Sequence, residues 1–460
     1  MTTQRELQTG DWPAPTLAEP PKGLAHLHIP GSKSLTNRYL LLAALADSPS
    51  RIRRPLLSRD SQLMIGALEQ LGARFSYVEQ ADEVTPDIVV EPIDFSSPAL
   101  RKPRRLAIDT GLAGTVMRFA PPVAALVPGE ITFDGDPHAR KRPMGPVIDA
   151  LRHLGVTVDD DNRSAMPFTM HSTGQVLQPE LHIDASASSQ FVSAVLLAAA
   201  RFERGVTLRH VGAAIPSMPH VQMTLEVMRE VGIEVTTLED TAWRVAPGAF
   251  PGFEVTVEPD LSNAGPFLAA AVVMGGTVAI ADWPSTTTQG GDQWRQILPR
   301  FGARVTEDRH ALRVTGPAGG AASGYPGIDI DLSEAGELAP TVAALCALAD
   351  SPSVLRGIGH LRGHETDRLA ALVSEINRLG GQASETADGL RIDSPVKHGA
   401  LFRTYDDHRM ATAAAVIGLH VPDVVVENVA TTAKTLPGFT EMWQSMLDQF
   451  VQEETDHGAE

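Results

Sequence analysis

Six stretches of small and apolar residues, nearly free of polar positions, recur along the chain at intervals of about 75 residues. A stretch that is apolar all round predicts a helix buried inside a core, and a constant interval predicts a repeated structural unit. The stretches begin near Ser34, Gly114, Ser188, Asn263, Leu338 and Asp407.

Each apolar stretch is followed by a run typical of a β-strand, rich in Val, Ile or Leu and bounded by Gly, Ser or Pro. In most units an amphipathic helix comes next, as in Met64, Ala67, Leu68 and Leu71, where Gly72 then supplies a C-cap signal. The predicted strands cover residues 51–57, 130–134, 205–211, 277–283, 353–358 and 423–429.

Strands that alternate with helices predict an α/β protein built as two similar halves of three units each. We expect a flexible tail over 1–20, one domain from 21–31 plus 258–460, and a second domain from 32–257. A short strand near 24–29 would return to the second half, so the chain would cross twice between the domains. The cleft between the two domains is then the expected active site.

Composition limits the classes of partner. The 460 residues carry a net charge of −18, which argues against a general nucleic-acid surface. Apolar runs are too short and too punctuated to predict a membrane span, and residues 1–20 do not resemble a signal peptide. The single cysteine, Cys346, excludes an internal disulfide, favours a reducing cytoplasmic location, and lies inside an apolar stretch, which predicts core packing.

The segment 30–38, Pro-Gly-Ser-Lys-Ser-Leu-Thr-Asn-Arg, places polar donors where a turn enters a predicted helix. Helix N-termini offer free N–H groups and partial positive charge, which suits anions. Lys33 adds a point charge and Arg38 a planar fork that fits a carboxylate or phosphate. The glycine spacing of a Walker loop is missing. A plain helix cap beside surface cations is the alternative interpretation.

Other predicted helices of the first half also begin with polar groups. A glycine turn leads through Gly114 to Arg118, and Ser188, Ser189 and Gln190 place two hydroxyls and an amide at one helix start. Serines at such positions can also be simple caps. The cationic run 138–143, which includes Arg142, follows a predicted strand, where substrate loops usually lie.

The second half supplies acids together with further cations. Glu337 stands at a helix start and could act as a base if a hydroxyl lay within reach. The segment 364–368 alternates charges without the second His of a zinc helix. Residues 406–408 have metal-ligand side chains, but the adjacent Arg409 argues against a metal. Ligands with several negative charges would draw the cations of both halves together, namely Lys33, Arg38, Arg118, Arg142, Arg368, Arg409 and Lys434.

Taken in order, these motifs resemble the 5-enolpyruvylshikimate-3-phosphate synthase (3-phosphoshikimate 1-carboxyvinyltransferase) family of enolpyruvyl transferases. The resemblance runs from about Leu27 to Phe439. It rests on Pro-Gly-Ser-Lys-Ser at 30–34, Ala-Gly-Thr at 113–115, Arg-Pro at 142–143, Ser-Ser-Gln at 188–190, Glu-Thr-Asp-Arg at 365–368, Asp-His-Arg-Met at 407–410 and Lys-Thr at 434–435.

The resemblance implies a two-domain inside-out α/β barrel of six βαββαβ-like units. It implies transfer of the enolpyruvyl group of phosphoenolpyruvate to the 5-hydroxyl of shikimate 3-phosphate, with release of phosphate. This is the sixth step of the shikimate pathway, towards chorismate and the aromatic amino acids. No metal, organic cofactor, nucleic acid or membrane partner is implied, and a monomer is expected.

The resemblance also implies roles for individual residues. Glu337 would accept the proton of the 5-hydroxyl, and Lys33 or Glu365 would deliver a proton to the methylene carbon, with His364 beside them. Shikimate 3-phosphate would contact Lys33, Ser34, Arg38, Ser188, Ser189, Gln190, Ser217, Glu337 and His364. Phosphoenolpyruvate would contact Lys33, Gly114, Arg142, Gln190, Arg368, Arg409 and Lys434.

Four positions depart from the usual family pattern. Asp is usual at Glu337, Lys at His364, Asn at Leu112 and Tyr at His220. A histidine in place of lysine would titrate near neutrality and alter the pH profile. The changes at Leu112 and His220 put one donor beside phosphoenolpyruvate and one phosphate contact in doubt.

Three alternatives remain at this point. A sister transferase that acts on UDP-N-acetylglucosamine generally carries Cys in its mobile loop and Lys-Asn where this chain has Lys33-Ser34, and the loop 136–143 has no Cys. A non-catalytic anion-binding repeat protein would explain the helices and cations but not Glu337, Glu365 and His364. An RNA-end-processing enzyme is disfavoured by the negative net charge.

Overall fold

The structure is a computed structural model that describes residues 8–17, 21, 23–80, 85–308 and 311–456. The chain divides into two compact units. Unit 1 combines Met1–Ile29 with Pro259–Glu460, and unit 2 is the continuous segment Pro30–Glu258. Each unit is described separately below.

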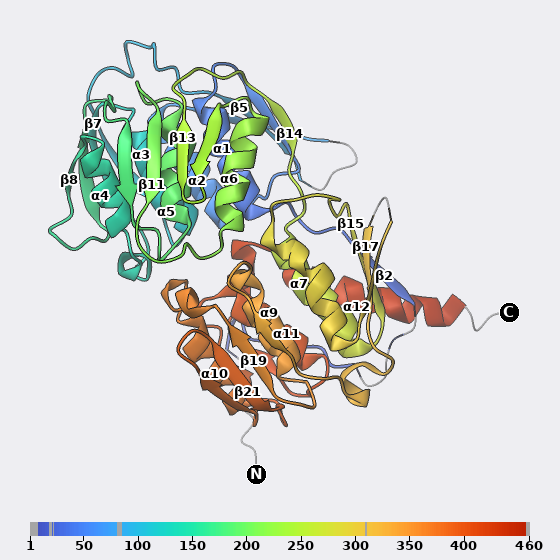
Figure 1. The fold of residues 1–460 in the computed structure, drawn as a ribbon. Coiled ribbons are helices and arrows are strands. Elements are labelled where there is room, and N and C mark those ends of the chain that lie inside the picture. Colours follow the sequence, from blue (N-terminus) through green and yellow to red (C-terminus); the bar gives the residue numbers. More distant parts are fainter. Residues whose placement is uncertain (1–7, 18–20, 22, 81–84, 309–310, 457–460) are drawn as a thin grey trace. The chain divides into compact units, whose positions relative to one another are not determined.

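In unit 2, helices alternate with small sheets (Figure 1). The helices are α1 (Lys33–Leu45), α2 (Arg59–Leu71), α3 (Gly114–Ala124), α4 (Gly145–His153), α5 (Gln190–Ala199) and α6 (Pro219–Glu230), with a 3₁₀ turn at Ala139–Lys141. The strands are β3 (Ser50–Arg53), β4 (Arg74–Val78), β5 (Asp87–Glu91), β6 (Arg104–Asp109), β7 (Gly129–Asp134), β8 (Thr157–Asp159), β9 (Phe168–Ser172), β10 (Glu180–Ile183), β11 (Val206–His210), β12 (Val235–Glu239), β13 (Ala242–Val245) and β14 (Glu254–Thr256).

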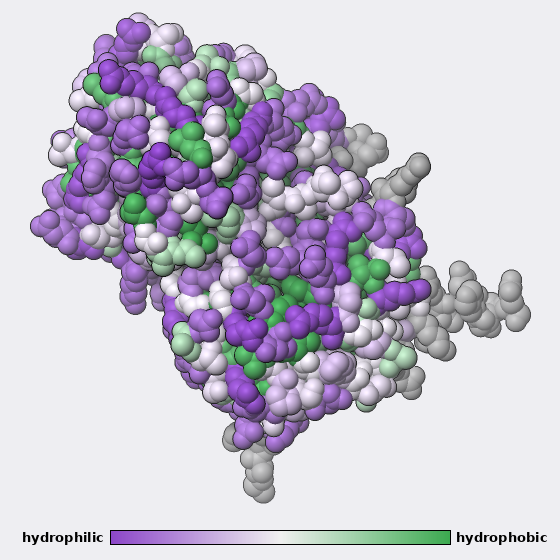
Figure 2. Space-filling view, viewed as in Figure 1, coloured by the Kyte–Doolittle hydropathy of each residue, from purple (hydrophilic) through white to green (hydrophobic). Residues whose placement is uncertain are grey.

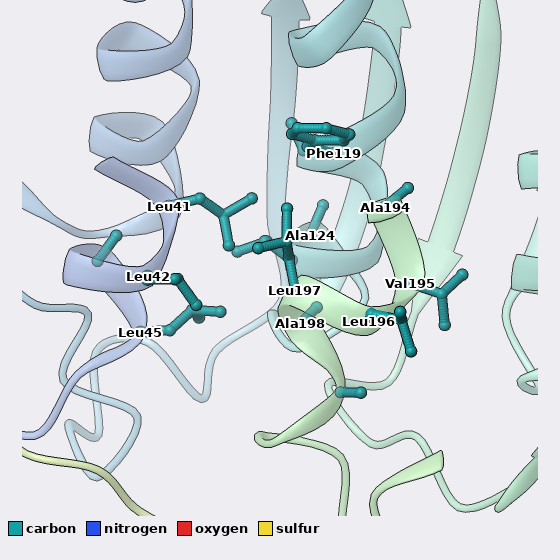
Figure 3. Close-up of a cluster of buried hydrophobic side chains, with 14 of the residues drawn as sticks. Leu41, Leu42, Leu45, Phe119, Ala124, Ala194, Val195, Leu196, Leu197 and Ala198 are labelled. Carbon is teal, nitrogen blue, oxygen red and sulfur yellow. The ribbon is translucent and has the colours of Figure 1, made fainter. Parts of the chain in front are cut away.

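The core of unit 2 lies where α1, α3 and α5 pack against one another. Leu41 and Leu45 of α1 point towards Phe119 and Ala124 of α3 and towards Leu197 of α5 (Figure 3). All five side chains are fully buried. These helices have no solvent-facing side, which is why their sequences lack a polar stripe.

Unit 1 repeats the plan with α7, α9 and α11 at its centre. Its helices are α7 (Leu261–Met274), α8 (Trp294–Ile297), α9 (Ala339–Cys346), α10 (Arg368–Arg378), α11 (His408–Gly418) and α12 (Phe439–Asp456), with 3₁₀ turns at Gly290–Gln293, Leu298–Phe301, Gly320–Ser323, Gly336–Leu338, Gly359–Gly363 and Val429–Lys434. Its strands are β1 (Trp12–Pro13), β2 (Leu24–Leu27), β15 (Thr277–Ala281), β16 (Arg304–Glu307), β17 (Ala311–Thr315), β18 (Asp329–Asp331), β19 (Ser353–Arg356), β20 (Gln382–Glu385), β21 (Leu390–Ser394), β22 (Leu401–Phe402) and β23 (Val425–Val426).

Five sheets of the described chain share one pairing pattern, in which two parallel strands are followed by two antiparallel ones. Their strand orders are β6-β7-β9-β8, β10-β11-β13-β12, β14-β3-β5-β4, β2-β15-β17-β16 and β18-β19-β21-β20. The repeated pattern agrees with the predicted repeat and with the predicted α/β class.

The chain passes from unit 1 into unit 2 after Ile29 and returns to unit 1 at Pro259. β2 precedes α1 of unit 2 in the chain but pairs with β15 of unit 1, and β14 precedes α7 of unit 1 but pairs with β3 of unit 2. At the base of unit 2 the Ser32 backbone N–H donates to the Glu258 carbonyl over 2.8 Å, which ties the beginning of this unit to its end. The predicted strand near 24–29 is therefore confirmed as β2.

Within the described part of the predicted tail, the expectation of a flexible segment is wrong. Trp12–Pro13 pairs antiparallel with β23, and the Trp12 ring lies 6.0 Å from that of Phe439. The N-terminal segment thus supplies one strand of the three-stranded sheet in the sixth repeat, whose strand order is β1-β23-β22. A two-residue strand is too short to show any alternation, and residues 1–7 and 18–20 lie outside the described residues.

The six apolar stretches form α1, α3, α5, α7, α9 and α11, as predicted. The strand expected over 423–429 is reduced to Val425–Val426. Cys346 is buried in α9, and burial raises the pKa of its thiol to about 12, as suits a core residue.

Hydrophilic residues cover most of the visible face of both units, and apolar residues appear there in small groups (Figure 2). Among the helices of the described residues, none combines the length and the apolar character that crossing a bilayer requires.

Candidate active site

The first turn of α1 carries two of the predicted residues, Lys33 and Ser34. Ser32 caps the helix, its hydroxyl accepting from the Leu35 N–H over 3.5 Å, so that Lys33 and Ser34 occupy the first two helical positions. Lys33 lies with Nζ 3.6 Å from the Asp60 carboxylate, which is almost fully buried. Both groups are therefore held at the start of α1, where an anion would meet free N–H groups.

Arg38 lies one turn further along α1 and is 1% exposed. Its guanidinium donates to Thr224 Oγ1 over 2.8 Å, to the Ser34 carbonyl over 2.9 Å and to the His220 carbonyl over 3.0 Å. The guanidinium carbon also lies 5.3 Å from the centre of the Phe119 ring. These contacts fix the Arg38 guanidinium against α6. His220, where the sequence left a phosphate contact in doubt, contacts Arg38 through its backbone carbonyl.

Gly114 begins α3 at the centre of a polar cluster. A Cβ atom at this position would lie 2.9 Å from an Arg118 nitrogen, 3.0 Å from an Arg142 nitrogen and 3.2 Å from Gln190 Oε1. Arg118 donates to Gln190 Oε1 over 3.1 Å, and Arg142 donates to the Leu112 carbonyl over 3.0 Å. The structure therefore brings together residues that are up to 76 positions apart in the chain.

The hydroxyl residues of unit 2 lie at the starts of α5 and α6. Ser188 Oγ accepts from the Gln190 N–H over 3.3 Å, and Ser189 is buried at the N-cap of α5. Ser217 is buried with a left-handed φ of 51°, and its carbonyl accepts from the His220 N–H over 3.0 Å. The Ser188 hydroxyl thus satisfies one N–H at the start of α5, whereas Ser189 at the N-cap makes no side-chain cap hydrogen bond. A left-handed serine such as Ser217 is uncommon.

Glu337 lies in unit 1, on the 3₁₀ turn Gly336–Leu338 that precedes α9. Its carboxylate is in direct contact with the Arg409 guanidinium at the start of α11. About a quarter of the Glu337 side chain remains exposed, with 28% of its surface accessible, whereas Arg409 is 9% exposed. The predicted base and a predicted phosphoenolpyruvate ligand are therefore neighbours.

A second group surrounds the start of α10. The Glu365 carboxylate accepts from Lys434 Nζ over 2.7 Å and from Arg368 Nη2 over 3.0 Å, so it bridges two of the predicted cations. Arg368 Nη1 lies 3.2 Å from His364 Nδ1. Because a guanidinium can only donate, Nδ1 accepts here, and His364 carries its proton on Nε2.

Asp407 is the residue of this group that sequence reasoning named without a role. It is fully buried and accepts from Arg368 Nε over 2.7 Å and from the Arg409 backbone N–H over 2.9 Å. Burial by itself would lower the pKa of Arg368, but Asp407 and Glu365 raise it above its ordinary value. The described residues contain no group of three or more His, Cys, Asp or Glu side chains suited to a metal ion.

Three polar groups that support the site were not singled out from the sequence: Asp60 beside Lys33, Thr224 beside Arg38, and Glu375, which is described below. The N-cap position of Asp407 ahead of α11 was a usable signal, because Asp is favoured there. Asp60 and Thr224 lie within helices, where such side chains are expected to face solvent, and nothing in the sequence marks them.

The arrangement concentrates cations, with four of the seven predicted ones in unit 2 and three in unit 1. Lys33, Arg368 and Arg409 stand at or near helix starts beside carboxylates. Such groups can bind phosphate and carboxylate and can move protons between a hydroxyl and a carbon atom.

Comparison with known proteins agrees with this chemistry. The sequence model of the family described as EPSP synthase (3-phosphoshikimate 1-carboxyvinyltransferase) matches residues 20–443. A 3-phosphoshikimate 1-carboxyvinyltransferase of Kocuria rhizophila is 58% identical over 437 residues, covering 95% of this chain and 96% of that protein.

Solved structures show the same fold. An EPSP synthase from Acinetobacter baumannii superposes with a TM-score of 0.74 at 22% identity, covering 94% of this chain and 97% of that one. The enolpyruvyl transferase NikO from Streptomyces tendae has a TM-score of 0.68 at 17% identity, covering 95% and 96%. These structures support the two-domain inside-out α/β fold. With a family match over nearly its whole length and a relative more than half identical, this chain belongs to the EPSP synthase family.

Proposed function

We propose that this chain transfers the enolpyruvyl group of phosphoenolpyruvate to the 5-hydroxyl of shikimate 3-phosphate, releasing phosphate, with the residues described above. The 58% identity to a 3-phosphoshikimate 1-carboxyvinyltransferase over nearly all of both chains is the observation that carries the reaction. The contacts within each unit support the assignment of individual residues.

For shikimate 3-phosphate, the hydroxyl groups at the starts of α5 and α6 suit the 3-phosphate, and the start of α1 suits the carboxylate. Glu337 and His364 of unit 1 would act on the same substrate. The proposed contacts are Lys33, Ser34, Arg38, Ser188, Ser189, Gln190, Ser217, Glu337 and His364.

For phosphoenolpyruvate, the cation cluster around α10 and α11 offers three positive side chains held by three carboxylates, those of Glu337, Glu365 and Asp407. The narrow approach at Gly114 would let a small anion reach the backbone between Arg118, Arg142 and Gln190. The proposed contacts are Lys33, Gly114, Arg142, Gln190, Arg368, Arg409 and Lys434.

In the proposed reaction Glu337 accepts the proton of the 5-hydroxyl, whose oxygen bonds to C2 of phosphoenolpyruvate. Lys33 or Glu365 delivers a proton to C3, which becomes a methyl group, and the charge that develops at C2 is stabilised by the adjacent anions. Loss of phosphate and of one methyl proton then restores the double bond. Glu365 would fill this role only in its protonated form, after leaving its contacts with Lys434 and Arg368.

The test is phosphate release from the purified chain given phosphoenolpyruvate with and without shikimate 3-phosphate. Release only when both are present supports the proposal. Release with UDP-N-acetylglucosamine instead would favour the sister transferase, and binding without turnover would favour an anion-binding protein. Size-exclusion chromatography with light scattering on the same sample tests the proposed monomer, and cell fractionation tests the proposed cytoplasmic location.

A further inference from the structure

Glu375 is a carboxylate with no exposed surface that none of the roles above employs. It lies on α10, seven residues after Arg368, so the two side chains stand two turns apart on the same face of the helix. A buried carboxylate is costly unless charged or hydrogen-bonding partners surround it, so its partners indicate its purpose.

Those partners lie mainly on the segment that precedes α11. Glu375 accepts from the Arg403 backbone N–H over 3.0 Å and from the Tyr405 hydroxyl over 2.7 Å. Arg378, one turn further along α10, donates to the same carboxylate over 2.9 Å. The carboxylate thus joins α10 to residues 403–405.

The segment 403–407 has an unusual backbone. Tyr405 and Asp406 have φ angles of 55° and 57°, both in the left-handed region that residues with a Cβ adopt at a cost of about 1 kcal/mol each. Such a conformation persists only where surrounding contacts fix it. The Asp407 N–H closes this turn by donating to the Thr404 carbonyl over 2.9 Å.

The turn is therefore clamped to α10 at both ends. Glu375 holds Arg403 and Tyr405, and Asp407 holds Arg368 Nε at 2.7 Å. Asp407 also accepts from the Arg409 N–H and so begins α11. The orientations of Arg368 and Arg409 both depend on where this turn places Asp407.

We propose that Glu375 is a positioning residue for phosphoenolpyruvate, which acts by clamping the 403–407 turn so that Asp407 aligns Arg368 and Arg409. The proposal rests on the proposed function, because it assumes that these two cations bind phosphoenolpyruvate. It predicts an effect on one substrate without a matching effect on the other, which a purely structural role would not produce.

The test compares Michaelis constants for the two substrates in Glu375→Gln, Tyr405→Phe and Asp87→Asn. The last is a matched control, because Asp87 is also a buried carboxylate and pairs with Arg51 over 2.6 Å in unit 2. Tyr405→Phe removes a single hydroxyl and guards against a Glu375 variant that does not fold.

We expect the KM for phosphoenolpyruvate to rise about tenfold in Glu375→Gln and about threefold in Tyr405→Phe, as loss of charge-assisted hydrogen bonds implies. The KM for shikimate 3-phosphate should stay within about twofold of the parent value. The double variant should exceed Glu375→Gln by less than about twofold, since both changes release the same turn.

An unchanged KM for phosphoenolpyruvate in both variants would overturn the proposal, as would equal rises for both substrates that Asp87→Asn reproduces. An unsubstituted chain that releases no phosphate would instead count against the proposed function. In that case hydrogen exchange over 403–409 tests the clamp directly. Faster exchange in Glu375→Gln supports the clamp, and unchanged exchange refutes it.

Discussion

The carboxylate of Glu337 contacts the guanidinium of Arg409, which joins the start of α9 to the start of α11 within unit 1. The backbone N–H of Arg409 also donates a hydrogen bond to the Asp407 carboxylate. A residue proposed as the base is therefore held by a residue proposed to bind the second substrate, so that binding and proton transfer share one contact.

Replacing Glu337 with Gln tests the proposed base. The carboxamide can still accept from Arg409 but cannot accept the 5-hydroxyl proton, so we expect kcat to fall by about 10²–10⁴-fold. Binding of shikimate 3-phosphate, followed by calorimetry, should be retained. Glu334→Gln is the matched control, because Glu334 is exposed three residues earlier, and it should leave kcat unchanged. A Glu337→Gln variant with the parent kcat would remove Glu337 from the mechanism.

A methyl group at Gly114 should crowd the cluster at the start of α3. The new Cβ would meet Arg118 and Arg142 nitrogens at 2.9 and 3.0 Å, which is too close without a shift of both side chains. We expect Gly114→Ala to raise the KM for phosphoenolpyruvate about tenfold, a loss typical of displaced charged contacts.

Gly66→Ala provides the comparison for that variant. Nothing lies within 4 Å of a Cβ at Gly66, which is inside α2, so kinetic constants should not change. Stability should rise by about 0.5–1 kcal/mol, because alanine favours the helix. If Gly114→Ala leaves the KM for phosphoenolpyruvate unchanged, the small anion does not approach this backbone.

The histidine at 364 should leave a mark on the pH profile. Nδ1 of His364 lies 3.2 Å from Arg368 Nη1, a cation that opposes the imidazolium form, whereas an anionic substrate nearby would favour that form. Imidazole ordinarily titrates near pH ~6.5 and a lysine amine near ~10.4. We therefore expect His364→Lys to move the pH optimum of kcat upward. Identical pH profiles of kcat for the parent protein and the His364→Lys variant would contradict this prediction.

The buried carboxylate of Asp160 in unit 2 should make the free energy of unfolding depend on pH in the acid range. Asp160 accepts from Arg152 over 2.7 Å and from the Ser164 N–H over 2.8 Å. Burial alone would raise its pKa, but these contacts outweigh burial and hold it below the ordinary value. Its contribution is therefore present above pH ~4 and lost as the pH falls through the lowered folded-state pKa.

We expect Asp160→Asn to destabilise unit 2 by about 2 kcal/mol at pH 7 in urea unfolding, with the difference shrinking towards pH 3. Asp161→Asn is the control, because Asp161 is exposed and asparagine tolerates the same left-handed backbone. If the difference in unfolding free energy between Asp160→Asn and the parent chain stayed constant from pH 7 to pH 3, the charge of Asp160 would not be what stabilises unit 2.

Much of the fold could be predicted because a helix without a polar face must be buried in the core. The stretches that begin near Gly114 and Leu338 became buried helices for this reason. The N-terminal strand Trp12–Pro13 could not be predicted, because two residues have no periodicity and their partner lies more than 400 positions away.

The candidate site also contains residues that could be predicted from the sequence and residues that could not. Exposed-looking polar residues at helix starts, such as Lys33 and Glu337, were visible as breaks in an apolar pattern. Glu375 was not, because a single Glu in an amphipathic helix reads as part of the solvent face. Only the three-dimensional contact with Tyr405 reveals that it is buried.

The pairing of β2 with β15 has a consequence for the order in which the chain acquires structure during synthesis. β2 leaves the ribosome early, yet its partner β15 is made only after the whole of Pro30–Glu258. At 5–20 residues per second this delay is on the order of ten seconds or more. The continuous unit can fold during that interval, while β2 waits unpaired. The N-terminal end of this protein is therefore among the last parts to be completed, which reverses the usual order of co-translational folding.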